Sequence, residues 1–183
     1  AGSDASATDP IYVSFRPAGL TSGLYVTRTI TAAMSLVVSS GSTLGTVSAT
    51  PARLYVCAID NAGTVELAIW NPLVATGPTL RGINESGVVT STAEGGAGAA
   101  DTAQVLYSTT ARSSVAVRVL GYIECNETTA GTWAQAPSVL QVMGPGVRRT
   151  GDTVQVVHTQ TGAVATGVTL VPYDDTIPQK TEG

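Results

Sequence analysis

The sequence predicts an all-β protein, an antiparallel β-sandwich or jelly roll with a C-terminal β-hairpin extension. Short runs rich in β-branched and aromatic residues recur along the 183 residues, and Gly, Pro, Ser and Asn separate them. No window combines apolar residues at helical spacing with a cap at each end, so we expect no helices. Short strands at regular spacing, with turn signals between them, are typical of sandwiches and jelly rolls.

Three runs near the N-terminus are predicted strands. Residues 11–15 (IYVSF) and 24–30 (LYVTRTI) alternate in polarity, as half-buried strands do. Residues 34–38 (MSLVV) form an apolar run that leads into a Ser-Ser-Gly turn. All three are expected to join the sheet.

The strongest local signal is a β-hairpin. Residues 53–60 (RLYVCAID) and 64–70 (TVELAIW) are rich in strand formers, and the Asp-Asn-Ala-Gly sequence around their junction tolerates a tight turn. Alternation in the second strand predicts which side chains share a face: Val65, Leu67 and Ile69 on one side, Glu66 and Ala68 on the other.

The middle of the chain combines a predicted loop with two predicted strands. Residues 86–100 (SGVVTSTAEGGAGAA) hold three glycines near their end and are expected to form an exposed loop. Residues 103–108 and 115–124 are predicted strands. In the longer one, alternation places Val115, Val117 and Val119 on one face and Arg118, Leu120 and Tyr122 on the other.

The predicted domain organisation is a β-sandwich over residues 1–142, followed by a hairpin and connecting tail over 143–183. Gly144–Pro145–Gly146 interrupts any strand, and two further runs follow at 153–158 and 163–171. An isolated hairpin is marginal in water. This one is therefore expected to pair with the rest of the domain, with neighbouring chains, or with whatever follows Gly183.

Charge is scarce and scattered. Charged residues make up 12% of the chain and the net charge is −4, against about 25% charged residues in typical soluble domains. No basic cluster suggests a nucleic-acid partner. No apolar run approaches the ~20 residues of a membrane span, and no signal peptide is visible, so membrane insertion is not expected. A polar, uncharged surface suits a chain that packs against copies of itself.

The chemistry-bearing residues predict no enzyme, no metal site and no cofactor. The single histidine, His158, has no nucleophile or orienting acid in a recognisable pattern. Asp174–Asp175 and Asp60 lack the oxygen-rich loop that calcium requires. Cys57 and Cys125 match no zinc spacing; two buried free thiols are the favoured interpretation, and a disulfide between neighbouring strands is the alternative.

Two tryptophans suggest a ligand-binding function as the alternative to a structural one. Trp70 and Trp133 lie near predicted strand ends, where aromatic side chains usually cover a core. Sugar-binding modules also stack ligands on such residues. The sequence therefore keeps open a carbohydrate- or receptor-binding module that uses Trp70, Trp133 and the loop 86–100.

One stretch carries a family resemblance. Residues 104–141, QVLYSTTARSSVAVRVLGYIECNETTAGTWAQAPSVLQ, resemble a segment of tail-fibre-like virion structural proteins of tailed bacteriophages. Residues 43–69 (TLGTVSATPARLYVCAIDNAGTVELAI) and the ending LVPYDDTIPQKTEG, residues 170–183, look similar to the same family. Cys57 and Cys125 depart from that pattern.

The resemblance implies a repeated virion component, and it implies no catalytic residue. We expect a fibre or fibre-attachment domain at the surface or tail of a phage particle, assembled as a homotrimer with other virion proteins as neighbours. It is expected to support attachment to a host surface receptor or glycan. A hydrolase acting on surface polysaccharide is the least favoured hypothesis, because such sites need clustered acids or a nucleophile with its base.

Overall fold

The computed structural model describes residues 4–16, 24–73, 82–98 and 100–144. The chain divides into two units, Ala1–Val147 and Arg148–Gly183, and every described residue belongs to the first. The predicted hairpin within 143–183 therefore lies outside the described residues, as does His158.

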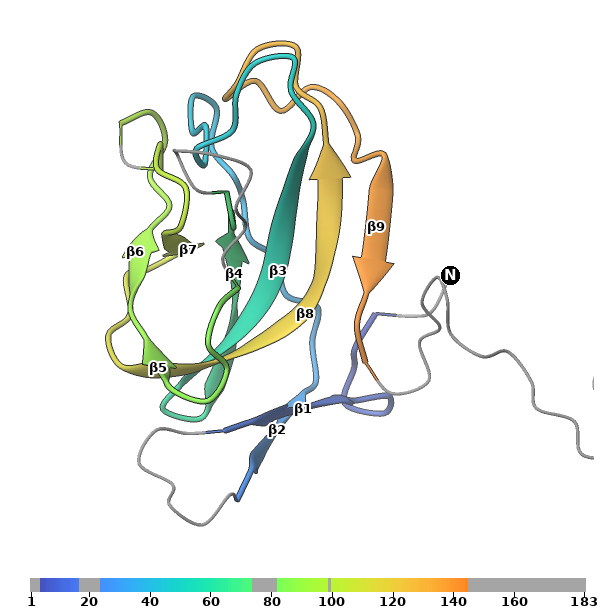
Figure 1. Cartoon of the computed structure of the whole chain (residues 1–183). Coiled ribbons are helices and arrows are strands. Elements are labelled where there is room, and N and C mark those ends of the chain that lie inside the picture. The colour runs from blue at the N-terminus through green and yellow to red at the C-terminus, as the bar shows by residue number, and fades with distance from the viewer. Residues whose placement is uncertain (1–3, 17–23, 74–81, 99, 145–183) are drawn as a thin grey trace, which may run out of the picture. The chain divides into compact units, whose positions relative to one another are not determined.

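The described residues are all-β, which confirms the predicted class, and they contain no helix (Figure 1). Strand-forming residues and turn residues alternate along the chain, and the strands follow that pattern. The strands are β1 (Ile11–Phe15), β2 (Val26–Ile30), β3 (Ala52–Asn61), β4 (Thr64–Trp70), β5 (Val88–Val89), β6 (Ser91–Ala93), β7 (Leu106–Ser108), β8 (Val115–Cys125) and β9 (Val139–Val142).

Seven strands form one nearly closed, barrel-like sheet. Its order is β5-β8-β3-β4-β7-β6, and β9 pairs with β8 beside β5. Only Thr90 separates β5 from β6, yet these strands lie at opposite ends of the order, so the sheet curls back on itself (Figure 1). The sequence predicted antiparallel pairing throughout, but β6 runs parallel to β7. The reversal occurs because one bent segment pairs with β8 through its first half and with β7 through its second.

The predicted hairpin is present as β3 and β4. Ala62 and Gly63 form its two-residue loop, with φ of 48° and 106°. Positive φ at both positions is the backbone of the turn whose twist matches the flanking strands. Asp60 Oδ1 accepts a hydrogen bond from Gly63 N at 2.8 Å, and Asp60 Oδ2 pairs with Arg28 Nη2 at 2.9 Å. Asp60 thus supports a turn and an ion pair.

The concave face of the sheet encloses an apolar cluster. Its members come from β3, β4, β7 and β8, and alternation along each strand points them inward. Tyr55, Trp70 and Val119 pack against it from the same face. The buried members are Cys57, Ile59, Ala68, Leu106, Val115 and Val117. The shared face predicted for Val115, Val117 and Val119 is confirmed.

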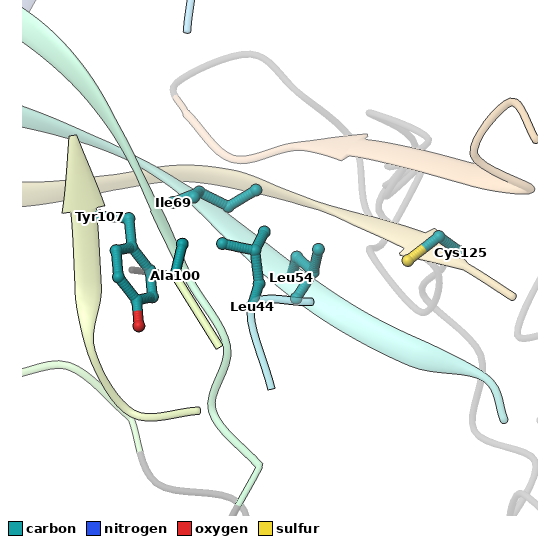
Figure 2. Close-up of a cluster of buried hydrophobic side chains, with 6 residues drawn as sticks. All are labelled: Leu44, Leu54, Ile69, Ala100, Tyr107 and Cys125. Atoms are coloured by element: carbon teal, nitrogen blue, oxygen red, sulfur yellow. The ribbon is translucent and has the colours of Figure 1, made fainter. Parts of the chain in front are cut away.

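The other face is covered by two more clusters. Near Leu54, the loop residues Leu44 and Ala100 cover the sheet (Figure 2). Near Ala58, the two-stranded sheet β1–β2 packs Phe15 and Ile30 against it. Leu54 and Ala58 point away from the concave face, and segments distant in sequence bury them there.

A β-bulge in β8 corrects one predicted face. Cys57 pairs with Val119, but the preceding Val56 pairs with Gly121, so Leu120 is an extra residue. The extra residue moves Tyr122 to the face of Val119, not the face of Leu120 as alternation predicted. Tyr122 there meets Tyr55 edge-on, with ring centroids 6.0 Å apart.

Three predicted segments differ from the structure. Residues 34–38 are apolar but enter no β-ladder; Leu36 and Val38 pack instead against the cluster around Leu54. The predicted loop 86–100 contains β5 and β6, which close the sheet. The predicted strand 103–108 is shortened to Leu106–Ser108, because only these residues pair with neighbours.

Candidate functional site

The largest exposed apolar side chain of the sheet lies on a strand with a free edge. β9 pairs with β8 along one side, and no described strand pairs with its other side. Leu140 is 73% exposed, and Val139 and Val142 are also exposed. The strand VLQV carries no charge. Exposed edges of monomeric proteins usually carry Lys, Pro or a bulge that blocks pairing, and the β9 edge has none of these in its four residues.

Close backbone contact holds β9 in place. Gly121 of β8 faces Val142. A Cβ at Gly121 would overlap the Gln141 carbonyl oxygen. Glycine is therefore required for β9 to lie at this distance. Beyond the strand, Met143 N donates to Leu120 O at 2.6 Å.

One backbone N–H of β8 lies between the residues that pair with β5 and those that pair with β9, and a side chain accepts its hydrogen bond. Glu85 Oε1 accepts a hydrogen bond from Val119 N at 2.5 Å, and Glu85 Oε2 pairs with Arg118 Nη1 at 3.4 Å. The carboxylate takes the place of a strand carbonyl. This part of the β8 edge is consequently blocked, whereas no described strand pairs with the outer edge of β9.

A groove connects the end of β9 with the β1–β2 hairpin. It has a volume of about 560 Å³, and its lining includes Ile11, Tyr12, Val142 and Met143. Ile11 and Tyr12 are also exposed. Together the groove and the β9 edge form one apolar region, which we call the β9 surface. Apolar regions of this kind mark protein–protein contacts.

The structure places the two predicted aromatic residues in different environments. Trp133 is half-buried, packs against the cluster around Leu54, and donates from Nε1 to Ser42 O at 2.8 Å. Trp70 packs against the cluster on the concave face. It lines a separate hollow of about 470 Å³ with Val89 and Thr92 from the predicted loop 86–100. Trp70 therefore lies beside Val89 and Thr92 of that loop, whereas Trp133 packs against the cluster that contains Ala100, at the other end of it.

Asp60 and the two cysteines, the other described candidates, occupy structural positions. Asp60 is occupied by Arg28 and its own turn. Cys57 and Cys125 are free and buried, which confirms the favoured interpretation of the thiols. No group of three or more metal-ligating side chains gathers within the described residues. None of the described segments forms a helix long and apolar enough to cross a membrane.

Comparisons with known proteins give no relative on which to base a function. No protein-family model, curated protein or solved structure matches the chain. The assignment of function rests on the residues and on the geometry above.

Sequence reasoning missed the strand at the centre of this surface. No strand is predicted at Val139–Val142, because the run between Pro137 and Gly144 is only four residues long. The sequence pattern that could have indicated this strand is three apolar residues among the four of VLQV, with strand-breaking residues on either side.

Proposed function

We propose that the chain is a structural subunit that self-associates through the β9 surface. The observation that carries this proposal is the open, uncharged β9 edge with Leu140 73% exposed. A second chain would satisfy the free backbone groups and cover the apolar side chains in one step. The low charge of the whole sequence, 12%, also favours close packing of copies.

The proposed setting is a bacteriophage virion. The resemblance of residues 104–141 to tail-fibre-like virion proteins supports a fibre or fibre-attachment domain, a homotrimer, other virion proteins as partners and a place at the particle surface or tail. Its function would be mechanical: strand edges buried between chains hold a fibre together and support host attachment. No catalytic step belongs to this proposal.

The finer fold is part of the same proposal. The β1–β2 sheet packs through Phe15 and Ile30 across the large sheet near Ala58, which gives two face-to-face layers. Such layers support a sandwich or jelly-roll arrangement. The proposed fold also keeps a C-terminal β-hairpin extension, which lies outside the described residues.

The oligomeric state tests this function. We expect sedimentation velocity and light scattering of the full chain to give three chain masses, and Leu140→Lys to shift the equilibrium to monomer. Val37→Lys is the matched control, because Val37 is 72% exposed and lies outside the β9 surface. A wild-type chain that stays monomeric at micromolar concentration overturns the proposal. So does equal association of the two variants.

Carbohydrate or receptor binding is the second candidate function. The hollow that Trp70 forms with Val89 and Thr92 favours it, because an aromatic wall in a concave site suits a sugar ring. Screening the full chain on a glycan array tests this candidate. Trp70→Ala is expected to remove the glycans that this hollow retains and Trp133→Ala to leave them, whereas a signal that is indifferent to Trp70 excludes this site.

A further inference from the structure

A separate pocket lies where β3 and β8 meet the start of β9. Its volume is about 610 Å³, and Val47, Pro51 and Leu73 supply apolar walls. The pocket is large enough for a small organic ligand, for which sites of about 300–1,000 Å³ are usual. It shares no lining residue with the Trp70 hollow or with the groove of the β9 surface.

An ion pair supplies the polar part of this pocket. Arg53 donates to Glu124 Oε1 from Nε at 3.0 Å and from Nη2 at 2.5 Å. Both bonds end on the same oxygen, so Glu124 Oε2 accepts none from the described residues. The Arg53 guanidinium also lies over the Tyr122 ring, 4.4 Å from its centroid. Stacking and pairing together fix the orientation of both charged groups.

A second polar side chain of the lining, Asn126, has no hydrogen-bond partner in the part of the chain that the structure describes. Asn126 is exposed, and its amide makes no hydrogen bond with the described residues. An amide offers both donors and an acceptor, and Glu124 Oε2 offers an acceptor. A ligand hydroxyl, which donates and accepts, complements such a set.

The electrostatics of the lining favour an uncharged ligand. Arg53 and Glu124 are its charged residues, and their charges cancel. Cys125 also lines the pocket, and burial, followed by the charge of Glu127, raises the pKa of its thiol, which keeps it neutral. A charged ligand would therefore gain no net attraction.

We propose that this pocket binds one residue of a neutral saccharide. The ring hydroxyls pair with Glu124 Oε2 and the Asn126 amide, and the C–H face of the ring lies against Val47 and Pro51. The proposal goes beyond self-association, because it uses no residue of the β9 surface. It also differs from the Trp70 hollow in every residue that it uses.

An array of neutral oligosaccharides, followed by saturation-transfer NMR with the retained glycan, tests the proposal on the full chain. We expect Glu124→Gln and Asn126→Ala each to weaken binding about tenfold, which is the effect of losing one hydrogen bond to a charged or well-placed group. Val47→Arg is expected to abolish binding by filling the pocket from an exposed position.

Matched controls make the outcome decisive. Val37→Arg places the same charge on an exposed valine outside this pocket and should bind as the wild type does. Leu140→Lys should also keep binding, so a failure of self-association is distinguishable from a failure of this site. Absence of any retained neutral glycan overturns the proposal, and so does equal binding by Val47→Arg and Val37→Arg.

Discussion

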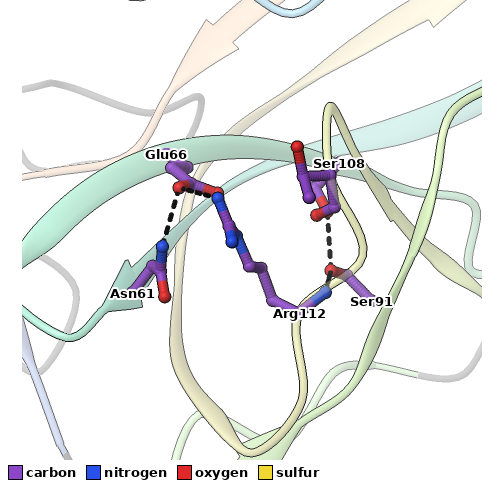
Figure 3. Close-up of polar contacts among 6 residues, drawn as sticks. Asn61, Glu66, Ser91, Ser108 and Arg112 are labelled. Carbon is purple, nitrogen blue, oxygen red and sulfur yellow. Dashed lines mark hydrogen bonds and ion pairs between the residues drawn. The ribbon is translucent and has the colours of Figure 1, made fainter.

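Arg112 holds Glu66 with two parallel hydrogen bonds, from Nε to Oε2 at 2.9 Å and from Nη2 to Oε1 at 2.6 Å (Figure 3). Asn61 adds a third bond to the same carboxylate, and Arg112 N donates to Ser91 Oγ at 2.9 Å. Ser91 in turn contacts Ser108 through a 2.6 Å hydroxyl pair. The loop before β8 is thereby tied to β4, β6 and β7.

This pair predicts a specific acid sensitivity. The hydrogen bond from Arg112 is the main cause that lowers the pKa of Glu66. A carboxyl group whose pKa is lower in the folded than in the unfolded chain stabilises the native state. This stabilisation is complete when the pH is above the unfolded pKa, and it is lost as the pH falls through the folded pKa. We expect Glu66→Gln to lower the urea midpoint at neutral pH, and the difference from wild type to shrink from about pH 5 downward.

A more exposed ion pair serves as the control for this experiment. Glu124→Gln removes the Arg53–Glu124 pair, whose side chains are 42% and 32% exposed. Exposed pairs contribute little to stability, so its urea midpoint should stay near that of the wild type. A Glu66→Gln difference that persists unchanged in acid contradicts the assignment.

The environment of Glu127 indicates that replacing this residue should stabilise the protein. The residue is 2% exposed, and neither carboxylate oxygen has a hydrogen-bond partner among the described residues. A buried charge without a partner is costly. We expect Glu127→Gln to raise the free energy of unfolding by about 1–3 kcal/mol, measured by urea denaturation at neutral pH.

The same change at a paired carboxylate should act in the opposite direction. Glu85 accepts from Val119 N and pairs with Arg118, so Glu85→Gln removes a favourable charge and lowers stability slightly. If Glu127→Gln destabilises the chain instead, its carboxylate has a partner in the native protein.

Local patterns were sufficient for the hairpin and insufficient for the closure of the sheet. The β3–β4 hairpin follows from residues adjacent in sequence, and both its existence and its faces were predictable. β5 and β6 hold two and three residues, and their partners β8 and β7 lie further along the chain. Such short segments become strands only through pairing with distant ones, which alternation does not reveal.

The β9 surface was hidden for the same reason. Its apolar content is visible in the sequence, but the free edge depends on β9 lying against Gly121. The extra Leu120 also shifts the faces of β8, and no local signal marks that bulge. The pocket beside Arg53 and Glu124 combines residues from four regions of the chain, so only the fold brings them together.

The two thiols should react at different rates. Cys57 is fully buried on the concave face, and burial, with a smaller contribution from Glu85, raises its pKa to about 12. Cys125 is 4% exposed and lines the pocket beside Arg53 and Glu124. Because the thiolate is the reactive form, iodoacetamide at about pH 8 should modify Cys125 first and leave Cys57 protected in the native chain.

Peptide mass mapping measures this order directly. Both thiols should be modified quickly in urea, and Cys125→Ser should show almost no native labelling. Native labelling of Cys57 at the rate of Cys125 would show that the concave cluster opens readily.

Gly121 should control the attachment of β9. Gly121→Ala places a Cβ against the Gln141 carbonyl, so β9 must move away from β8. We expect a loss of about 1–3 kcal/mol in the free energy of unfolding and faster hydrogen exchange at the amides of Val139–Val142. Gly82→Ala is the control, because a Cβ at Gly82 meets no atom within 4 Å. Since the β9 edge is the proposed contact between chains, Gly121→Ala should also weaken self-association. A variant that exchanges and associates as the wild type does would show that β9 tolerates the extra atom.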